Sequence, residues 1–595
     1  KYELQSVTGF DLQTIGSILP FVKVNRDFET LNITPKEVFS NGKHELLIRT
    51  QVILEDQKGF LPIDSADLAE SPNSRYLGSK PKLYARYRFK YRNNISFGVT
   101  AEKDAGEEFF QGTQKKGFDF YSAHAFAKNI GPIKRLAIGD YQVQFGQGLT
   151  VWTGLSLGKS PDVMNIKKSA QSIKPYTSVN ENLFMRGGAL TVGFKDFEFT
   201  AFYSKKKIDA NVVRDTFDFF IVQVTSFVQS GFHSKPSELE NKDAIDETIL
   251  GGNLSYKKRN FSMGFTAMRS ETEAYFDRVI SPYNQFEFTG DNNVNIGLDY
   301  NYIYKNVNLF GEVSRSLNGG MGYINGALVG LDPRLSITLL HRHFDMDFQN
   351  LFSNAISEGS RNINEDGLYF GAISKLNRKW TLSGYYDTFV FKWLRYRTDA
   401  PSHGSEWRTE LKYKHSKRVE IYARGRREIK RENPSPHRER IDNLVSVSRT
   451  YMRINAKYKV TDNLKFQSRI ERSEYVKDDG APDKGYILFQ DIIYKMPNAP
   501  VTVSFRYAVI ETDSYNSRIY AYENDVLYAF SIPAYYYRGS RMYLMGRLKL
   551  RNGMSLWLRF AQTYYDDRDV FSGGSLNEIR GKTKSEVKAM LKYKF

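Results

Sequence analysis

Apolar and polar side chains alternate at every second position over much of this chain. The final segment, residues 584–595, follows the pattern most strictly. Successive side chains of an extended strand point to opposite faces, so every second residue shares a face. One face of this segment comprises Val587, Ala589, Leu591, Tyr593 and Phe595, and the other comprises Lys588, Met590, Lys592 and Lys594. The segment is therefore predicted to be a strand with one face suited to lipid and the other to water.

A hairpin is predicted for residues 83–103. Its first strand has an apolar face of Leu83, Ala85, Tyr87, Phe89 and Tyr91 and a basic face of Tyr84, Arg86, Arg88, Lys90 and Arg92. After a turn at Asn93 and Asn94, the apolar face continues with Ile95, Phe97, Val99 and Ala101. Segments of about ten residues with this period recur from His44 onward, and that length suits a strand that crosses a bilayer. The predicted fold class is all-β, a large antiparallel transmembrane β-barrel of the outer-membrane type.

Short turns between these segments set the expected number of strands. We find eleven, at residues 92–94, 129–132, 195–196, 257–260, 305–306, 332–333, 377–379, 415–417, 461–463, 497–500 and 551–553. Outer-membrane barrels have short turns in the periplasm and long loops outside, so with both termini periplasmic these turns predict about 24 strands. If residues 518–530 and 531–537 form a further hairpin, the number rises to about 26.

The composition agrees with a barrel and excludes several other classes. The mean hydropathy of −0.50 is too polar for a helical membrane protein, and no run of apolar residues is long enough for a membrane helix. The 39 tyrosines and 42 phenylalanines can form aromatic girdles at the two interfaces. No cysteine is present, so disulfides and thiol chemistry are excluded. No signal peptide is evident, and we expect a mature or trimmed form.

The first residues differ from the rest of the chain. In residues 1–24, apolar side chains recur at helical spacing around a turn at Thr8 and Gly9, and Pro20 ends the pattern. This segment resembles the second half of a helix-hairpin-helix, in which Gly9 is the hairpin turn. The chain thereby resembles large outer-membrane barrels of Bacteroidota that carry such a segment, related to competence-type DNA-binding proteins. Residues 139–152 and 520–530 resemble sequence blocks of the same family.

Two domains are expected from this division. Residues 1–40 form a periplasmic helical hairpin with a linker, and residues 41–595 form the barrel. The resemblance implies that the hairpin binds DNA phosphates. The alternative is a small cap or plug that packs on the barrel. In the block 139–152, Gly146 and Gly148 are expected to bend the strand as it leaves the membrane, with Trp152 near the outer interface.

The formal net charge of +18 means that lysine and arginine outnumber the acidic residues, and the positions of these surplus basic side chains must be assigned. We predict that a basic set faces the lumen, comprising Arg86, Arg88, Lys90, Arg424, Arg426, Arg453, Lys457, Lys459, Arg541 and Arg547. Inward glutamates such as Glu406, Glu410 and Glu471 are expected on neighbouring strands, where cross-strand pairs stabilise a sheet. Such pairs explain the glutamates but leave an excess of lysine and arginine. That excess would attract anionic solutes, phosphates or an acidic partner.

Metal-binding and catalytic patterns are weak. His341, His343 and Asp345 share one strand face, but the apolar set Leu335, Ile337 and Leu339 runs into them, so interfacial polarity is the preferred interpretation. Two groups of loop acids are weak calcium candidates, Asp478, Asp479 and Asp483 in one and Asp566, Asp567 and Asp569 in the other. We find no nucleophile elbow and no phosphate-binding loop. We therefore predict no enzyme, no metal and no cofactor.

Three functions fit these observations. The first is a conduit for large or anionic cargo, because a barrel of this size is too wide for side chains alone to fill. The second is a scaffold in a larger outer-membrane complex, and the third is a component of nucleic-acid uptake. The segment 205–247, with its apolar run 218–228, is the best internal candidate for a plug, or else a site that holds a partner.

The predicted location and partners follow from the fold class. We expect a Gram-negative outer membrane, with periplasmic termini and extracellular long loops. The expected partners are the lipid bilayer with its lipopolysaccharide, the outer-membrane assembly machinery, and other outer-membrane proteins or surface lipoproteins. The C-terminal end of the last strand, with Leu591, Tyr593 and Phe595, resembles the signal that the assembly machinery recognises.

Overall fold

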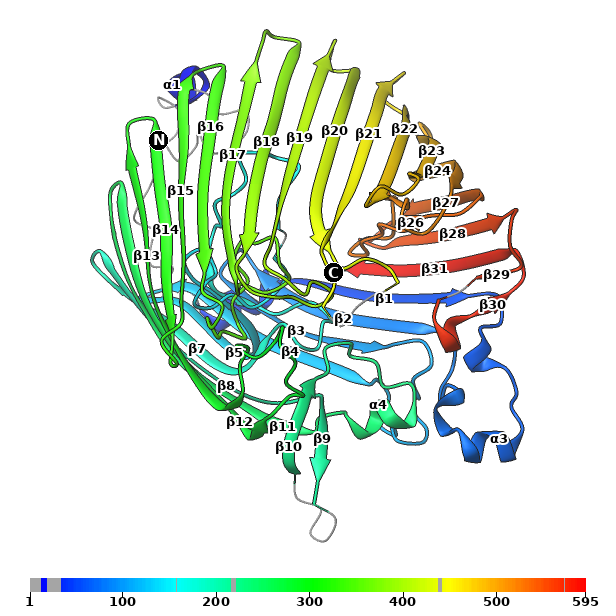
Figure 1. Cartoon of the computed structure of the whole chain (residues 1–595), viewed down its shortest axis with the longest axis horizontal. Coiled ribbons are helices and arrows are strands. Elements are labelled where there is room, and N and C mark those ends of the chain that lie inside the picture. Colours follow the sequence, from blue (N-terminus) through cyan, green and yellow to red (C-terminus); the bar gives the residue numbers. More distant parts are fainter. Residues whose placement is uncertain (1–11, 19–33, 157, 216–220, 437–440, 572) are drawn as a thin grey trace.

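The computed structural model describes residues 12–18, 34–156, 158–215, 221–436, 441–571 and 573–595. Within them, twenty-four strands form one closed antiparallel sheet (Figure 1). They are β1 Lys43–Ile53, β2 Lys82–Tyr91, β3 Ile95–Lys103, β4 Phe120–Ile130, β5 Ile133–Gln144, β7 Met185–Phe194, β8 Phe197–Ile208, β11 Ile245–Lys258, β12 Phe261–Phe276, β13 Gly290–Tyr304, β14 Val307–Ser316, β15 Met321–Asp332, β16 Leu335–Phe344, β17 Glu365–Lys375, β18 Trp380–Phe391, β19 Ser402–Lys414, β20 Val419–Glu432, β21 Val445–Lys459, β22 Leu464–Lys477, β23 Asp483–Lys495, β24 Val501–Thr512, β27 Gly539–Lys549, β28 Ser555–Tyr565 and β31 Thr583–Lys594.

The remaining elements are short and are not part of the closed ring, although β6 pairs with β5 and β10 pairs with β12. The strands are β6 Ser172–Pro175, β9 Ala210–Arg214, β10 Ile221–Phe227, β25 Ile519–Tyr520, β26 Ala534–Tyr535, β29 Val570–Phe571 and β30 Ile579–Arg580. The α-helices are α1 Leu12–Ile18, α2 Pro35–Ser40, α3 Ser65–Glu70 and α4 Pro236–Glu240. The 3-10 helices are η3 Lys58–Phe60, η4 Pro72–Ser74 and η5 Ser575–Asn577. In the described chain, none of the helices has the length and hydropathy needed to cross a membrane.

The barrel closes through its first and last strands. β1 pairs antiparallel with β31, with Ile48 opposite Leu591 and Thr50 opposite Ala589. In Figure 1 the red β31 accordingly lies beside the blue β1. Closure removes the unpaired edges that hydrocarbon cannot solvate. The predicted pairing of the first strand with the last is confirmed.

The predicted fold class and the count of 24 strands are also confirmed. The alternative of 26 strands is wrong, because β25 and β26 pair only with each other. Each of the eleven predicted short turns joins two consecutive barrel strands. Six of them contain a residue in the left-handed region, as tight hairpin turns require, namely Arg92 (φ 48°), Asn129 (φ 54°), Lys195 (φ 55°), Arg259 (φ 50°), Lys305 (φ 51°) and Asn552 (φ 57°). These turns, the start of β1 and the end of β31 lie at one end of the barrel, which we call the short-turn end.

The outer face of the barrel is apolar along the strands. Side chains such as Val99, Leu254, Leu298, Ile454 and Leu488 point outward, and each is about half exposed. The inward residues between them are polar or covered by loops. This alternation matches the predicted assignment of faces, and it places Leu591 and Tyr593 on the outer face beside Leu46 and Ile48. Phe595 stacks on His44 at 4.9 Å between ring centroids.

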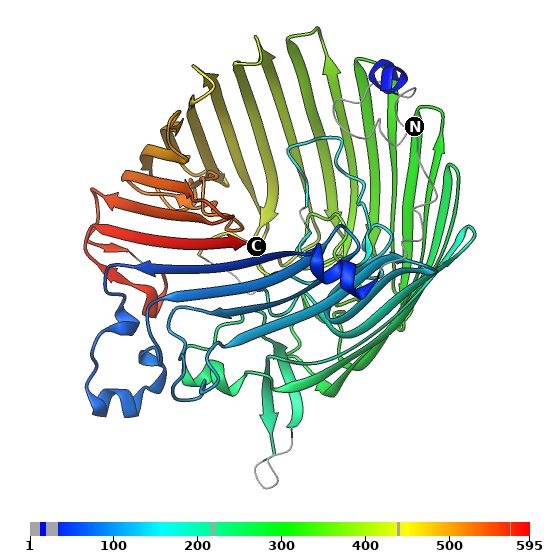
Figure 2. The same cartoon turned by 180° about the vertical axis from the view of Figure 1, so that it is seen from behind.

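The helix α2 covers the outer face of β2 near the short-turn end (Figure 2). Its Val38 is buried against Phe89 and Tyr91, and Phe39 contacts Phe89 at 5.9 Å between ring centroids. Thr34 caps the helix by accepting a hydrogen bond from the Glu37 N–H. The predicted hairpin turn at Gly9 lies outside the described residues.

A cysteine pair across the closing strands tests the observed register. Because the chain has no cysteine, Thr50→Cys with Ala589→Cys and Ile48→Cys with Leu591→Cys introduce the only thiols. Both pairs face outward on paired residues, so we expect an intramolecular disulfide, measured by a gel shift in intact outer membrane. Thr50→Cys with Lys588→Cys is the control, since these side chains point to opposite faces. Crosslinking of the control alone would contradict the register.

The assignment of faces predicts different effects at neighbouring positions of β31. Leu591→Arg places a charge on the lipid face, which costs about 2 to 4 kcal/mol at the bilayer midplane and less toward the interfaces. Lys592→Leu should be milder, because the Lys592 Nζ lies inward at 3.4 Å from Glu45, and Glu45 keeps Arg86 and Arg88 as partners. Heat-modifiable migration on a gel reports the folded fraction of each variant. Equal losses would reverse the assignment.

Candidate functional site

The lumen of the barrel has two different halves. Toward the long loops, inward charged side chains are buried, as Arg342 and Arg559 (each 1% exposed) and Asp387 (0%) illustrate. Toward the short turns, inward lysines such as Lys457 and Lys465 are exposed. In the described chain, the lumen is therefore occupied by protein toward the long loops and exposed to solvent toward the short turns.

Three connections between strands fold inward and occupy the long-loop half. We call them the lumen segments; they comprise residues 145–176, 345–364 and 513–538. Each one contacts inward side chains of the barrel wall, as described below. Figure 1 shows parts of these connections inside the ring of strands.

The first lumen segment is anchored by Glu312 of β14. This carboxylate accepts hydrogen bonds from the backbone N–H groups of Gln147 (2.5 Å), Leu149 (3.0 Å) and Thr150 (2.8 Å). Gly146 has a φ of 53°, and a Cβ there would lie 2.5 Å from the Glu312 carboxylate. A side chain is thus excluded where the backbone approaches the wall. Gly146 and Gly148 bend the chain just after β5, as predicted, with φ values of 53° and 84°. The predicted position of Trp152 at the outer interface is wrong, because the chain turns into the lumen, where the Trp152 N–H donates to the Phe352 carbonyl.

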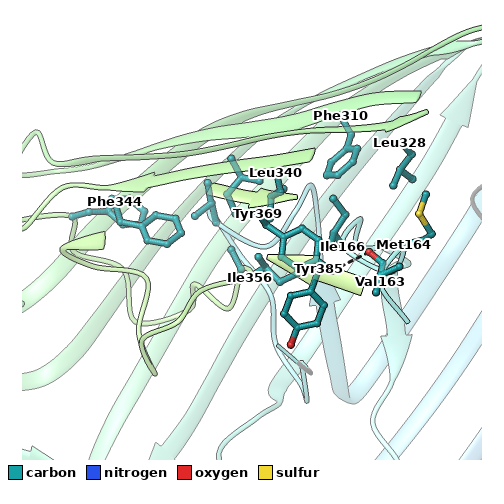
Figure 3. Packing of buried hydrophobic residues seen from close by; sticks show 14 residues of the cluster. Val163, Met164, Ile166, Phe310, Leu328, Leu340, Phe344, Ile356, Tyr369 and Tyr385 are labelled. Atoms are coloured by element: carbon teal, nitrogen blue, oxygen red, sulfur yellow. Dashed lines mark hydrogen bonds between the residues drawn. The ribbon is translucent and has the colours of Figure 1, made fainter. Parts of the chain in front are cut away.

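Apolar side chains of the same segment pack on the same part of the wall, from β14 to β18 (Figure 3). Val163, Met164 and Ile166 form one buried cluster with inward residues of β14 to β18, namely Phe310, Ile324, Leu328, Leu340, Phe344, Tyr369 and Tyr385. The Tyr369 hydroxyl donates a hydrogen bond to the Val163 carbonyl at 3.1 Å. The segment thus extends from β5 to a distant part of the wall, and its apolar residues form a core inside the barrel.

One lysine joins the first lumen segment to both the second segment and the wall. The Lys159 Nζ lies 2.6 Å from Glu358, 3.0 Å from Asp387 and 2.7 Å from Glu406. Glu358 belongs to the second lumen segment, whereas Asp387 and Glu406 are inward residues of β18 and β19. Buried charges require such partners, so this contact fixes the position of both segments.

The third lumen segment presents carboxylates to a basic part of the wall. Glu523 accepts hydrogen bonds from Arg541 (2.7 Å) and contacts Arg559. Asp525 lies 2.7 Å from the Lys588 Nζ. Further along, the Tyr528 ring stacks under the Arg86 guanidinium at 4.3 Å. The block 520–530 is therefore the part of this segment that lies against the wall.

Most of the predicted lumen cations have a partner. Arg86 and Arg88 contact Glu45, Arg424 contacts Glu410, Arg426 contacts Glu406, Arg453 contacts Glu471, Arg541 contacts Glu523 and Lys459 contacts Asp462. Arg547 stacks on Trp557 at 4.9 Å. In the described part of the chain, Lys90 and Lys457 have no carboxylate within ion-pair distance. Cross-strand pairing therefore accounts for most of this set.

The sequence analysis missed the carboxylates that hold the lumen segments. Glu312, Asp387, Glu523 and Asp525 are all buried or half-buried, and all contact residues far away in the chain or on another strand. Glu312 does carry a local signal, since it is the one acidic residue of β14 and occupies an inward position between Phe310 and Ser314. Its partner is a loop backbone, which no sequence pattern identifies.

The expectation that residues 205–247 fold inward as a plug is wrong for the residues described. β9 and β10 form a hairpin that projects from the barrel (Figures 1 and 2). The apolar run contributes Val224, which is buried against Ala210, Phe276 and Phe288 in a cluster outside the lumen. Residues 216–220 lie outside the described chain. The run is apolar because it packs beside β12, not because it fills the barrel.

Residues 228–243 instead join two other long loops in what we call the loop cap, together with residues 56–80 and 104–119. The Leu77 N–H donates to the Ser234 carbonyl at 3.0 Å. At the centre of the cap, the His233 ring contacts Asp119 at 2.6 Å through Nδ1 and Asp209 at 2.9 Å through Nε2. The His233 N–H also donates to Glu107 at 3.0 Å.

The electrostatics of the cap follow from this crowding. Burial lowers the pKa of His233, but the hydrogen bonds and charges of Asp119 and Asp209 outweigh it and raise the pKa to about 10. Burial raises the pKa of Glu107 to about 7 and that of Glu181 to about 8. The cap is thus held by a histidine that stays protonated among carboxyl groups.

The histidine and loop-acid groups considered in the sequence analysis are not among the sets of three ligating side chains that the described chain brings together. His343 lies on the outer face between Asp345 (2.9 Å) and Asp366, and His341 contacts the Tyr323 ring. Among the described residues, groups of three metal-ligating side chains occur elsewhere, at Glu107, Asp119 and His233, at Glu181, Asp209 and His233, and at Glu358, Glu406 and Glu428. Ammonium, guanidinium or imidazolium groups already contact several of these carboxylates.

Closure, the outward apolar band and the inward polar face define an outer-membrane β-barrel. No protein-family model and no curated protein matches this chain. Solved structures that it resembles include the FrpB iron transporter of Neisseria meningitidis (F3-3 variant), with 9% identity, 95% of this chain and 83% of that chain covered, and a TM-score of 0.43. Another is the siderophore receptor PirA of Pseudomonas aeruginosa, with 7% identity, 93% and 80% covered, and a TM-score of 0.41. Both TM-scores are below 0.5, so these two structures say nothing about what this chain binds.

The His233 contacts predict that the loop cap loosens as the pH rises. A group whose pKa is higher in the folded state stabilises that state below its unfolded pKa, and this contribution is lost as the pH rises to the folded value. For His233 the loss extends from 6.5 to about 10. We expect amide exchange in residues 104–119 and 228–243, relative to intrinsic rates, to be about tenfold faster at high pH, which corresponds to about 1.4 kcal/mol.

The variant His233→Gln separates this effect from general alkaline unfolding. It should exchange faster than the wild type already at low pH and change less as the pH rises. His403→Gln is the matched control, because His403 is exposed and has no hydrogen-bond partner in the described chain. Identical pH profiles for His233→Gln and the wild type would contradict the assigned role.

Proposed function

We propose that this protein is a conduit for anionic cargo in the outer membrane of a Gram-negative bacterium, partly filled at rest by its own lumen segments. The observation that supports this proposal is the distribution of inward cations along the barrel. Toward the long loops, buried carboxylates neutralise them. Toward the short turns, exposed lysines face the lumen with no carboxylate of the described residues within ion-pair distance.

These unpaired cations form a group that we call the vestibule lysines. They are inward, exposed and without a carboxylate within ion-pair distance in the described chain, and they comprise Lys90, Lys414, Lys457, Lys465, Lys495 and Lys549. They come from strands of one continuous arc, from β19 through β31 and β1 to β2. Low-dielectric walls focus the field of such a group, so the vestibule concentrates anions.

The topology supports an orientation. Outer-membrane barrels have short turns in the periplasm and long loops at the cell surface. We propose the same here, with periplasmic termini, so that the vestibule lysines face the periplasm and the loop cap faces outward. The outer face then contacts the bilayer and its lipopolysaccharide, and the assembly machinery handles the closing strands.

A scaffold in a larger outer-membrane complex is the second candidate function. The observation that favours it is the projecting β9–β10 hairpin, whose Val213 is 47% exposed. A surface lipoprotein or another outer-membrane protein would contact this hairpin. Purification from native membrane discriminates the two functions, since stoichiometric partners favour the scaffold.

Nucleic-acid uptake is a special case of the conduit. The vestibule lysines would attract phosphates, and binding would weaken with salt because counterions are released. The helix-hairpin-helix resemblance falls mainly on residues outside the described chain, so it adds no geometry to this proposal.

Planar-bilayer recordings test the conduit. Replacing residues 151–170 by a Gly-Ser linker removes the central part of the first lumen segment while both ends of its wall strands remain. We expect the folded variant to conduct, with a reversal potential in a salt gradient that indicates anion preference. In the same background, Lys457→Glu with Lys465→Glu should reduce this preference several-fold, because both lysines face the open lumen.

The control is Lys115→Glu with Lys116→Glu, which makes the same charge change in an exposed long loop. It should leave the ion preference unchanged. Arg424 and Arg426 are poorer targets, because their reversal would break ion pairs with Glu410 and Glu406. A folded deletion variant that passes no current, or one that prefers cations, would overturn the proposed function.

A further inference from the structure

The third lumen segment covers a basic region of the wall formed by β27, β28 and β31. The segment contacts three inward cations there, Arg541, Arg559 and Lys588. In the described chain, the wall supplies one carboxylate within ion-pair distance of them, Glu586, at 3.0 Å from Arg559 and 3.3 Å from Lys588. Without the segment, these three cations would therefore carry an excess of two positive charges.

The segment supplies two carboxylates to the same region. Glu523 is fully buried, and its Oε1 accepts hydrogen bonds from the Arg541 Nε at 2.7 Å and from the Tyr535 hydroxyl at 2.6 Å. Its Oε2 contacts Arg559 and lies 2.9 Å from a second nitrogen of Arg541. Asp525 lies 2.7 Å from the Lys588 Nζ. The charges brought by the segment thus match the excess on the wall.

The contact between Arg541 and Glu523 has the geometry with which arginine binds anionic ligands. Arg541 approaches the carboxylate through two nitrogens, as guanidinium groups bind carboxylates and phosphates. Arg559 completes the set of donors on the wall, whereas the Tyr535 hydroxyl belongs to the segment and leaves with it. A phosphate or carboxylate of a soluble anion can accept the bonds that Arg541 and Arg559 donate.

The segment is attached to this wall by side chains. In the described chain, no backbone-to-backbone hydrogen bond joins residues 516–536 to a barrel strand. β25 and β26 pair with each other, and Glu523 pairs with Ser531 within the segment. Apolar contacts of Ile519, Ala521 and Val526 hold it in place. Such a segment can leave the wall without breaking any strand pairing.

We propose that Arg541, Arg559 and Lys588 form an anion-binding site for ligands with two or more phosphate or carboxylate groups, and that Glu523 and Asp525 occupy it as an internal competitor. The inference rests on the proposed function, because the ligand would be the cargo of the conduit. Binding of a polyanion exchanges two internal carboxylates for two external anionic groups. The total charge of the site is conserved while the segment is released.

Isothermal titration calorimetry of the full chain in detergent tests the site, with pyrophosphate and succinate as separate probes. The variant Glu523→Gln with Asp525→Asn removes the competitor charges but keeps the side-chain shapes. We expect it to bind pyrophosphate at least about tenfold more tightly than the wild type. The succinate titration shows whether carboxylates are accepted as well as phosphates.

Two further variants make the result specific. Adding Lys588→Met to the double variant should abolish the gain, since it removes a wall cation. Asp478→Asn with Asp479→Asn makes the same charge change in an exposed loop and should bind like the wild type. If the double variant does not fold by heat-modifiable migration, Asp525→Asn alone keeps the Glu523 contacts and should give a smaller gain.

Two outcomes would overturn the proposal. One is equal affinity of the folded double variant and the wild type, and the other is a gain that persists with Lys588→Met, which would place binding elsewhere. Failure of the conduit is distinguishable from both. Tight binding that depends on Lys588, together with a folded deletion variant that passes no anion current, would retain the site and reject the proposed function.

Discussion

Hydrocarbon offers no hydrogen-bond partner to a backbone N–H or C=O group, and the rest of this structure depends on that constraint. A sheet in a bilayer must therefore close, as it does here through β1 and β31. Closure by antiparallel pairs of consecutive strands leaves side chains on two faces only. One face must be apolar, and the other is free to carry the charges that a soluble core would exclude.

A closed sheet of this size creates a second constraint, because its lumen is too wide for wall side chains to fill. The chain meets it with connections that fold inward, and each is held by buried charges with partners. Lys159 lies among three carboxylates, and Glu312 accepts bonds from three backbone N–H groups. The inward face is thus polar for two reasons, contact with water at one end and contact with loop backbone at the other.

Sequence alone predicted the strands well, because the alternation that defines them is local. The turns at Arg92, Lys195 and Lys305 and the closure of 24 strands follow from spacing along the chain. Sequence also placed Arg424 and Arg426 inward. It also placed their partners Glu410 and Glu406 inward on a neighbouring strand, but it did not show how much of the basic set such pairs neutralise.

The lumen segments could not be predicted in the same way. Their positions depend on pairs such as Lys159 with Glu406, which lie 247 residues apart and share no period. The apolar run 218–228 was a misleading signal, since Val224 is buried beside β12 rather than in the lumen. Composition shows that a segment must be buried, but the surface that buries it is a property of the folded chain.

The long separation between Lys159 and its carboxylates also orders events during assembly. The first lumen segment leaves the wall after β5, yet Asp387 and Glu406 lie on β18 and β19, which follow 228 and 247 residues after Lys159. Until those strands join the sheet, Lys159 lacks its Asp387 and Glu406 partners, and the backbone N–H groups after Gly146 lack Glu312 until β14 joins. An unfinished barrel must therefore keep its interior hydrated, and the interior can become dry only when the later strands arrive.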